Sequence, residues 1–342
     1  GKAGLIDLDL NQQQKVLNSY GYPMGLADYS AFILGGLPKQ GQTLEEVKDL
    51  LLNEIKKLRA GEFDEKMLQA NINNFKLYEL QSMESNEGRA DIFVNSFING
   101  TNWEDEVTAI DRMAKLTKED IVAFADKYLK EDNYAVVYKK QGKDPNEKKM
   151  TKPEITPIVS NRDVASPFLT SIQENAVKPI EPVFLDFKKD MSQLTAKSDI
   201  PVLYKQNTTN DLFQLIYVFD MGNNNDKALG TAFDYLEYLG TSDMTPEELK
   251  SEFYRLACTF YVSPGNERTY VVLSGLNENM PAAMQLFEKL LADAQVNKEA
   301  YNNLVGDILK ARADAKLNQG QNFSRLMNYA MYGPKSPATN LL

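Results

Sequence analysis

A stretch that cannot form a regular core element divides this sequence into two parts. Between residues 142 and 182 the hydrophobic periodicity disappears, and prolines interrupt a polar and charged run at Pro145, Pro153, Pro157, Pro167, Pro179 and Pro182. Each proline removes a backbone donor and fixes φ, which opposes long helices and central strands. With 342 residues, the chain is long enough for two domains of ordinary size. We therefore expect a first domain over residues 1–142, a linker over 143–182 and a second domain over 183–342.

The first part has the pattern of an α+β domain. Thr43 with Glu46 and Thr117 with Asp120 form two capping boxes, and each precedes a run of apolar residues at helical spacing. Further elements are expected as a strand at the start of the chain, a helix at 104–116 and a strand at 134–140.

The second part repeats this mixture of helices and strands. Strands are expected at 202–205, 213–221 and 269–276, and helices at 226–239 and 282–294. The helix pair within 44–69 is similar in order to the pair within 282–309, which indicates a repeated α+β domain. Chance similarity is the alternative explanation, because helix pairs are common and the residues themselves differ.

Charge and composition exclude several classes of partner and mechanism. The formal net charge of −10 and the sequence pI of about 4.9 oppose binding to nucleic acid or to anionic lipid. No apolar stretch approaches the roughly 20 residues that span a bilayer. The single cysteine, Cys258, lies in an apolar run and is predicted to be a small buried hydrophobe. One cysteine forms no intrachain disulfide, which leaves the redox compartment open.

The chain contains no histidine, so serine–histidine and cysteine–histidine catalysis are both excluded. Zinc sites that depend on imidazole nitrogens are excluded as well. We therefore predict no catalytic residues and no metal site in this chain.

The segment from Phe219 to Thr241 resembles the signature of the pitrilysin/insulinase family of zinc peptidases. In that family, a strand ending in glycine leads to a helix with the motif H-x-x-E-H, and a Gly-Thr pair follows. Two histidines at i and i+4 share one helix face and bind Zn²⁺, while the glutamate polarises a water. By this resemblance Asp234 and Tyr238 occupy the two histidine positions, and Glu237 alone matches the motif.

A third ligand in the family is a carboxylate from a later helix, and Asp307 lies near the corresponding place here. Asp234, Glu237 and Asp307 together would form an oxygen site better suited to Mg²⁺ or Ca²⁺ than to Zn²⁺. Carboxylates on a polar helix face usually meet solvent instead, and we interpret these three as structural.

The resemblance extends over most of the chain and implies its architecture. The segments 25–46, 61–74 and 118–138 are similar to the non-zinc-binding second domain of a family half, and 256–270 is similar to the strand pair behind the active-site helix. The expected fold is thus two similar domains of the insulinase-like metallohydrolase fold, each a largely antiparallel sheet with helices on one face. These would be the second and third of four homologous domains.

The resemblance also implies a function. The chain would be a non-catalytic segment of a zinc metalloendopeptidase that encloses peptide or protein substrates and supports an upstream catalytic domain, where zinc is expected. Its partners would be the substrate and the remaining domains of the same protein. The family resemblance also favours the bacterial periplasm over the cytoplasm. The alternative is a scaffold protein of the same fold that has lost peptidase activity.

Overall fold

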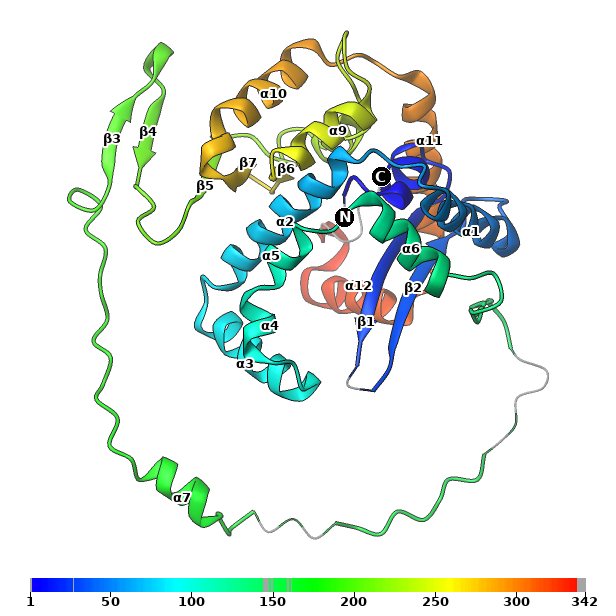
Figure 1. Ribbon diagram of the computed structural model, residues 1–342. Helices are drawn as coiled ribbons and strands as arrows, with labels where there is room; N and C mark the ends of the chain where they lie inside the picture. Colours follow the sequence, from blue (N-terminus) through cyan, green and yellow to red (C-terminus); the bar gives the residue numbers. More distant parts are fainter. Residues whose placement is uncertain are drawn as a thin grey trace. The chain divides into compact units, whose positions relative to one another are not determined.

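The structure is a computed structural model that describes residues 2–26, 28–143, 148, 150–158, 160 and 162–336. The chain forms two compact units, one of residues 1–136 with 207–342 and one of residues 137–206. Helices and antiparallel strand pairs follow one another along the chain, so the predicted α+β class is confirmed (Figure 1). The domain boundaries at residues 142 and 182 stay a prediction.

The first part of the larger unit combines a β-hairpin with helices. Strand β1 (Asn18–Gly25) pairs antiparallel with β2 (Ser30–Leu37). The helices are α1 (Leu44–Ala60), α2 (Lys66–Ser82), α3 (Asn86–Asn99), α4 (Trp103–Val107), α5 (Ala109–Met113) and α6 (Lys118–Tyr128). The hydroxyls of Thr43 and Thr117 accept the backbone N–H groups three residues later, so both predicted capping boxes are confirmed.

A small core joins the hairpin to α1 and to the N-terminal segment. Leu10, Val16, Val47 and Leu51 are buried together, and Leu10 comes from a π-helix, η1 (Asp7–Gln12). The expected strand at the start of the chain is therefore wrong, because these residues bury a helical face against α1. Residue 36 must be a glycine, because a Cβ there would collide with the Val47 side chain.

The second part of the larger unit contains a three-stranded antiparallel sheet. Its order is β5 (Leu212–Phe219), β7 (Thr269–Leu276) and β6 (Cys258–Pro264), and the strands of this sheet lie close to those predicted. The helices are α8 (Leu229–Leu236), α9 (Pro246–Arg255), α10 (Met280–Asp293), α11 (Lys298–Ala315) and α12 (Gln319–Tyr332).

Helices α9 and α10 pack on this sheet and form the largest buried cluster of the unit. Phe253 of α9 and Phe287 of α10 both contact Phe260 of β6, with ring centroids 5.1 and 4.9 Å away. Leu273 of β7 and Leu290 of α10 are fully buried in the same cluster. In this part, helices therefore cover the sheet, as the sequence predicts.

The two parts meet along α2 and α9. The Asn74 side-chain amide donates to the Tyr254 carbonyl oxygen at 2.7 Å, and the Tyr254 hydroxyl donates to Asn71 Oδ1 at 2.6 Å. Leu77 of α2 is buried with Leu276 and other residues of the second part. The two parts are far apart in the sequence but are joined by apolar contacts and by hydrogen bonds to buried groups.

The smaller unit contains most of the proline-rich stretch. It includes α7 (Pro167–Gln173), β3 (Ser192–Thr195), a 3-10 turn η2 (Lys197–Asp199) and β4 (Pro201–Tyr204). The strand expected at 202–205 forms β4, but it pairs with β3 and not with the sheet of the second part. A helix inside the linker was not expected; Pro167 is tolerated because it occupies the first turn, after the N-cap Ser166. Residues 144–147, 149, 159 and 161 of the predicted linker lie outside the described residues.

Two expected elements of the first part are wrong. The helix at 104–116 is broken into α4 and α5 at Thr108, whose hydroxyl donates to the Glu104 carbonyl oxygen at 2.7 Å. Residues 134–140 form no strand, because no described segment pairs with them and a strand requires a ladder of hydrogen bonds. In the part of the chain that the structure describes, each helix is too short or too polar to cross a bilayer.

Cys258 should be almost unreactive in the folded protein. Its side chain is buried at the start of β6, as the sequence predicts, and burial raises the pKa of the thiol to about 11. Because the thiolate is the reactive species, labelling by a maleimide at pH 7.5 should be at least about a hundredfold slower than in urea. Mass spectrometry over a time course measures both rates. Complete labelling of the folded protein within minutes would contradict this burial.

Candidate functional site

The candidate site is the end of α8, which carries the three residues that the sequence predicts to be a degenerate zinc motif. Asp234 lies in the last turn, Glu237 is the C-cap and Tyr238 follows, with its backbone N–H donating to the Tyr235 carbonyl oxygen at 3.0 Å. The helix is shorter than the predicted 226–239. The Asp226 carboxylate accepts the Ala228 N–H at 2.8 Å, which holds residues before 229 in a turn.

The three side chains differ in their exposure. Asp234 and Glu237 are exposed, as expected for carboxylates on a polar face, whereas Tyr238 is partly buried. Burial raises the pKa of the Tyr238 hydroxyl, and nearby carboxylates on Glu237, Asp307, Asp234 and Asp7 raise it further. The structure therefore brings Asp307 close to the motif, although α11 lies about seventy residues further along the chain than α8.

Asp307 is held by an ion pair with the first part of the chain. Its Oδ2 lies 3.2 Å from Lys39 Nζ, which also donates to the Gln14 carbonyl oxygen at 2.8 Å. Burial raises the pKa of Asp307, while the hydrogen bond and charge of Lys39 lower it. The carboxylate nearest to the expected third ligand position thus already faces a cation from its own chain.

The N-terminal helix η1 contacts the motif from another side. The Gln12 amide donates to the Glu237 carbonyl oxygen at 2.9 Å, and Lys250 Nζ donates to Gln12 Oε1 at 3.2 Å. The same ammonium group lies 2.7 Å from Asp7 Oδ2. Gln12 is therefore a bridge between the C-terminal end of α8 and α9.

These contacts determine the chemistry that the site can perform. The described residues contain no group of three or more Asp, Glu or Cys side chains arranged to hold a metal ion. Lys39 and Lys250 instead provide two ammonium groups beside Asp307 and Asp7. The charged contacts join η1 to α9 and Lys39 to α11, whereas Gln12 joins η1 to α8 through a neutral hydrogen bond.

The Gly-Thr pair after the motif shapes a cavity next to Tyr238. The backbone carbonyl oxygen of Gly240 accepts the Gln295 N–H at 3.0 Å, and a Cβ at position 240 would collide with the Met244 carbonyl oxygen. The resulting cavity of about 500 Å³ lies between this turn and residues 295–298. The glycine is thus required by close backbone packing.

Sequence reasoning found α8 and Asp307 but missed the residues that hold them. Gln12, Lys39 and Lys250 belong to no motif, and each acts on a residue far away in the sequence. Leu8 and Leu10 alternate with Asp7 and Asp9, which is the pattern of a half-buried strand, so the local sequence contains no signal for the π-helix η1.

Three solved structures show what this chain is similar to. A peptidase M16 inactive domain from Pseudomonas fluorescens is 17% identical with a TM-score of 0.38, over 44% of this chain and 38% of that one. The periplasmic protease PqqL from Escherichia coli is 13% identical with a TM-score of 0.38, over 98% and 41%. A mutant of the ferredoxin protease FusC, in complex with Arabidopsis ferredoxin, is 10% identical with a TM-score of 0.41, over 100% and 41%.

The chain spans less than half the length of each of these structures. They are an inactive peptidase domain and two proteases. At these identities and TM-scores the likeness assigns no residue a role. No family model matches the sequence, and no curated protein matches it.

Removing both motif carboxylates should change stability little. Asp234 and Glu237 are exposed, and a carboxylate in the last turn of a helix opposes the helix dipole. We expect the double variant Asp234→Ala, Glu237→Ala to shift the free energy of unfolding by no more than about 0.5 kcal/mol. Urea unfolding measures this shift, with the exposed pair Glu267→Ala, Glu278→Ala as the matched control. A loss of several kcal/mol relative to the control would contradict the exposed geometry.

Proposed function

We propose that this chain is a non-catalytic segment of an insulinase-like zinc metalloendopeptidase. In this proposal it forms one wall of the chamber that encloses a peptide substrate, and it supports a catalytic domain elsewhere in the same polypeptide. The observation that carries the proposal is the end of α8. There Glu237 keeps its place in the motif, while a carboxylate and a phenol stand at the two histidine positions.

The chemistry of the donors supports a site without zinc. Tight zinc sites use imidazole nitrogen or thiolate ligands, and Asp234 and Tyr238 offer neither. The Tyr238 hydroxyl has a raised pKa and is neutral near pH 7, so it is a poor ligand. Lys39 already faces Asp307, and its ammonium charge opposes a second cation at the same carboxylate. Zinc is therefore proposed for the catalytic domain of the parent protein alone.

The contacts of η1 support a role in holding the two domains together. Gln12, Lys39 and Lys250 connect the first part of the chain to the helices that would surround zinc in an active domain. A domain that no longer binds metal can use these polar positions for docking. Asp234 and Glu237 stay exposed and would give the chamber wall a negative charge.

Two proteins test this proposal: the chain alone and the full-length polypeptide that contains it. We expect the chain alone to hold no stoichiometric zinc and to hydrolyse no peptide. The full-length protein should contain zinc and cleave fluorogenic peptides, with activity lost on chelation and restored by zinc. Asp234→Ala, Glu237→Ala in the full-length protein should change the preference between cationic and anionic peptides while leaving zinc content unchanged.

Two results would contradict the proposal. One zinc per molecule in the dialysed chain would mean that the site at α8 binds metal. A full-length protein without zinc and without peptidase activity would instead be the scaffold protein of the alternative hypothesis.

A further inference from the structure

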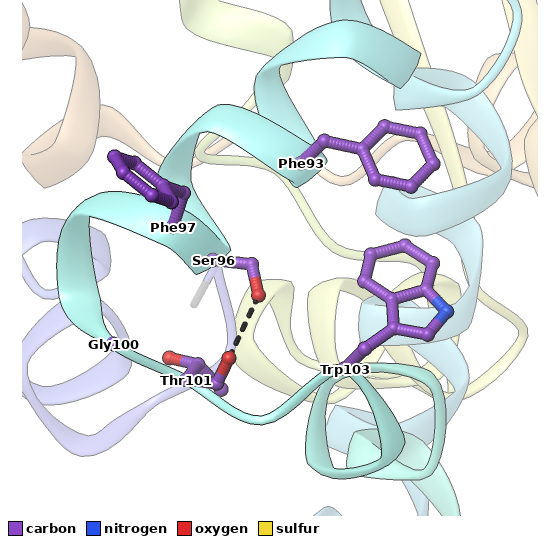
Figure 2. A pocket seen from close by; sticks show the side chains of 6 residues that line it. All are labelled: Phe93, Ser96, Phe97, Gly100, Thr101 and Trp103. Carbon is purple, nitrogen blue, oxygen red and sulfur yellow. Dashed lines mark hydrogen bonds between the residues drawn. The ribbon is translucent and has the colours of Figure 1, made fainter.

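A second cavity lies outside the α8 site, between α3 and α4. It has a volume of about 580 Å³ and is lined by Phe93, Ser96, Phe97, Gly100, Thr101 and Trp103 (Figure 2). It is widely open to solvent, so it is a shallow depression of the surface and not an enclosed pocket. Nothing in the proposed function uses this cavity.

Capping interactions fix the shape of the cavity. Gly100 ends α3 in the left-handed region, with φ of 63°, and the Ser96 hydroxyl donates to the Thr101 carbonyl oxygen at 3.0 Å. Asn102 then caps α4 through the Glu104 N–H. Trp103 therefore begins α4 at a defined position relative to α3.

Aromatic rings form the apolar surface of the cavity. The rings of Phe93 and Trp103 are stacked, with centroids 4.6 Å apart and an interplanar angle of 13°. Phe97 projects from α3 away from this pair and is 87% exposed (Figure 2). Exposed aromatic side chains that gather at one place mark interaction sites in soluble proteins.

The segment that carries the cavity is acidic. Residues 86–107 contain five carboxylates and one guanidinium. Glu104, Asp105 and Glu106 follow Trp103 directly in the first turn of α4. The guanidinium of Arg89 is committed to the Met83 carbonyl oxygen and the Asn86 side chain, and Arg112 of α5 lies 4.0 Å from Asp105 Oδ1.

We propose that this cavity binds a segment of a partner polypeptide in which an arginine or lysine is next to a large apolar side chain. The apolar side chain would pack on Phe97, and the cation would lie on an outer face of the Phe93–Trp103 stack, beside the α4 carboxylates. Cations are attracted both to aromatic faces and to carboxylates. This inference depends only on α3 and α4 and not on the proposed function.

Charge complementarity decides between occupants. Nucleic acids and anionic lipids are repelled by the α4 carboxylates and by the net charge of −10. A second copy of the chain on a twofold axis would place the same carboxylates opposite each other. A cationic segment of another polypeptide has the complementary charge.

The single tryptophan of the chain, Trp103, reports directly on this site. The probe is the peptide acetyl-Gly-Ser-Leu-Arg-Leu-Ser-Gly-amide, titrated against the whole chain while tryptophan emission is recorded. We expect saturable quenching that weakens as salt is added. The matched peptide with glutamate in place of arginine should bind at least about tenfold more weakly.

Variants locate the binding. Phe97→Ser and the double change Glu104→Gln, Glu106→Gln should each weaken binding of the arginine peptide at least about tenfold. Phe323→Ser on α12 removes another exposed phenylalanine and should leave binding unchanged. Circular dichroism of each variant checks that its helix content is retained.

Three results would overturn the proposal. Equal binding of the arginine and glutamate peptides would mean that charge plays no part. No change in emission up to about 10 mM peptide, an affinity weaker than that of most specific sites, would mean that no such site exists. Sedimentation that shows a dimer lost on Phe97→Ser would mean that a second copy covers the cavity.

Discussion

Replacing Phe287 by alanine is expected to lower the free energy of unfolding by about 3–5 kcal/mol, the usual cost of removing a buried phenylalanine. Phe287 is 2% exposed and connects α10 to the sheet through Phe260. Its neighbours Leu273 and Leu290 are fully buried in the same cluster and cannot collapse into the space without moving α10. Urea unfolding followed by circular dichroism measures the loss.

The matched control lies on the same helix. Leu291→Ala also shortens a large apolar side chain of α10, but Leu291 is 53% exposed. Its replacement should cost less than about 1 kcal/mol, because little surface is removed from the core. Equal costs for Phe287→Ala and Leu291→Ala would mean that α10 does not pack on the sheet as described.

Elements with a local cause could be predicted from the sequence. Helices α1 and α6 begin where their capping boxes place them, because the Thr hydroxyl and the acidic side chain satisfy amides within the same turn. The strands β5 and β7 were found from their β-branched and aromatic residues.

Elements that depend on distant contacts could not be predicted. The β1–β2 hairpin contains Pro23 and four glycines, and its residues have no clear alternation. The break at Thr108 depends on one side-chain hydrogen bond that competes with the helix. The π-helix η1 is selected by burial of Leu10 against α1.

The candidate site likewise combines residues with a local cause and residues that depend on distant contacts. The spacing of Asp234, Glu237 and Tyr238 is local, so a motif could locate them on α8. Their surroundings come from η1, Lys39 and Lys250, which are brought together by the packing of the two parts. No pattern in one sequence indicates which lysine will face Asp307.

Replacing Lys39 by methionine is expected to destabilise the protein by about 1–3 kcal/mol at pH 7, because it leaves the partly buried Asp307 carboxylate without its cation. The side chains of Lys39 and Asp307 are 21% and 18% exposed, so solvent screens the pair less than it screens a surface pair. Methionine keeps the length and apolar character of the lysine chain, so the loss reports on the ion pair together with the hydrogen bond to the Gln14 carbonyl oxygen.

The effect of Lys39→Met on stability should depend on pH, because it acts through the Asp307 carboxylate. Burial raises the pKa of Asp307 and Lys39 lowers it, so Lys39→Met should raise the pKa of this folded-state carboxyl further. A carboxyl group whose pKa is raised by folding stabilises the folded state below the unfolded-state pKa. This stabilisation is lost as the pH rises through the folded-state pKa. The penalty of Lys39→Met should therefore be largest near pH 7 and shrink as the pH falls toward 4.

A double-mutant cycle separates the ion pair from other roles of the two side chains. Asp307→Asn removes the charge that Lys39→Met leaves unpaired, so the double variant should be more stable than the sum of the single losses predicts. We expect a coupling free energy of about 1–2 kcal/mol at pH 7, measured by urea unfolding of the four proteins. Lys48→Met is the matched control, because Lys48 pairs with the exposed Asp49 beside it in the chain. A coupling below about 0.3 kcal/mol, which is within the additivity of independent sites, would mean that Lys39 does not hold Asp307, and the docking role of the α8 site would then be lost with it.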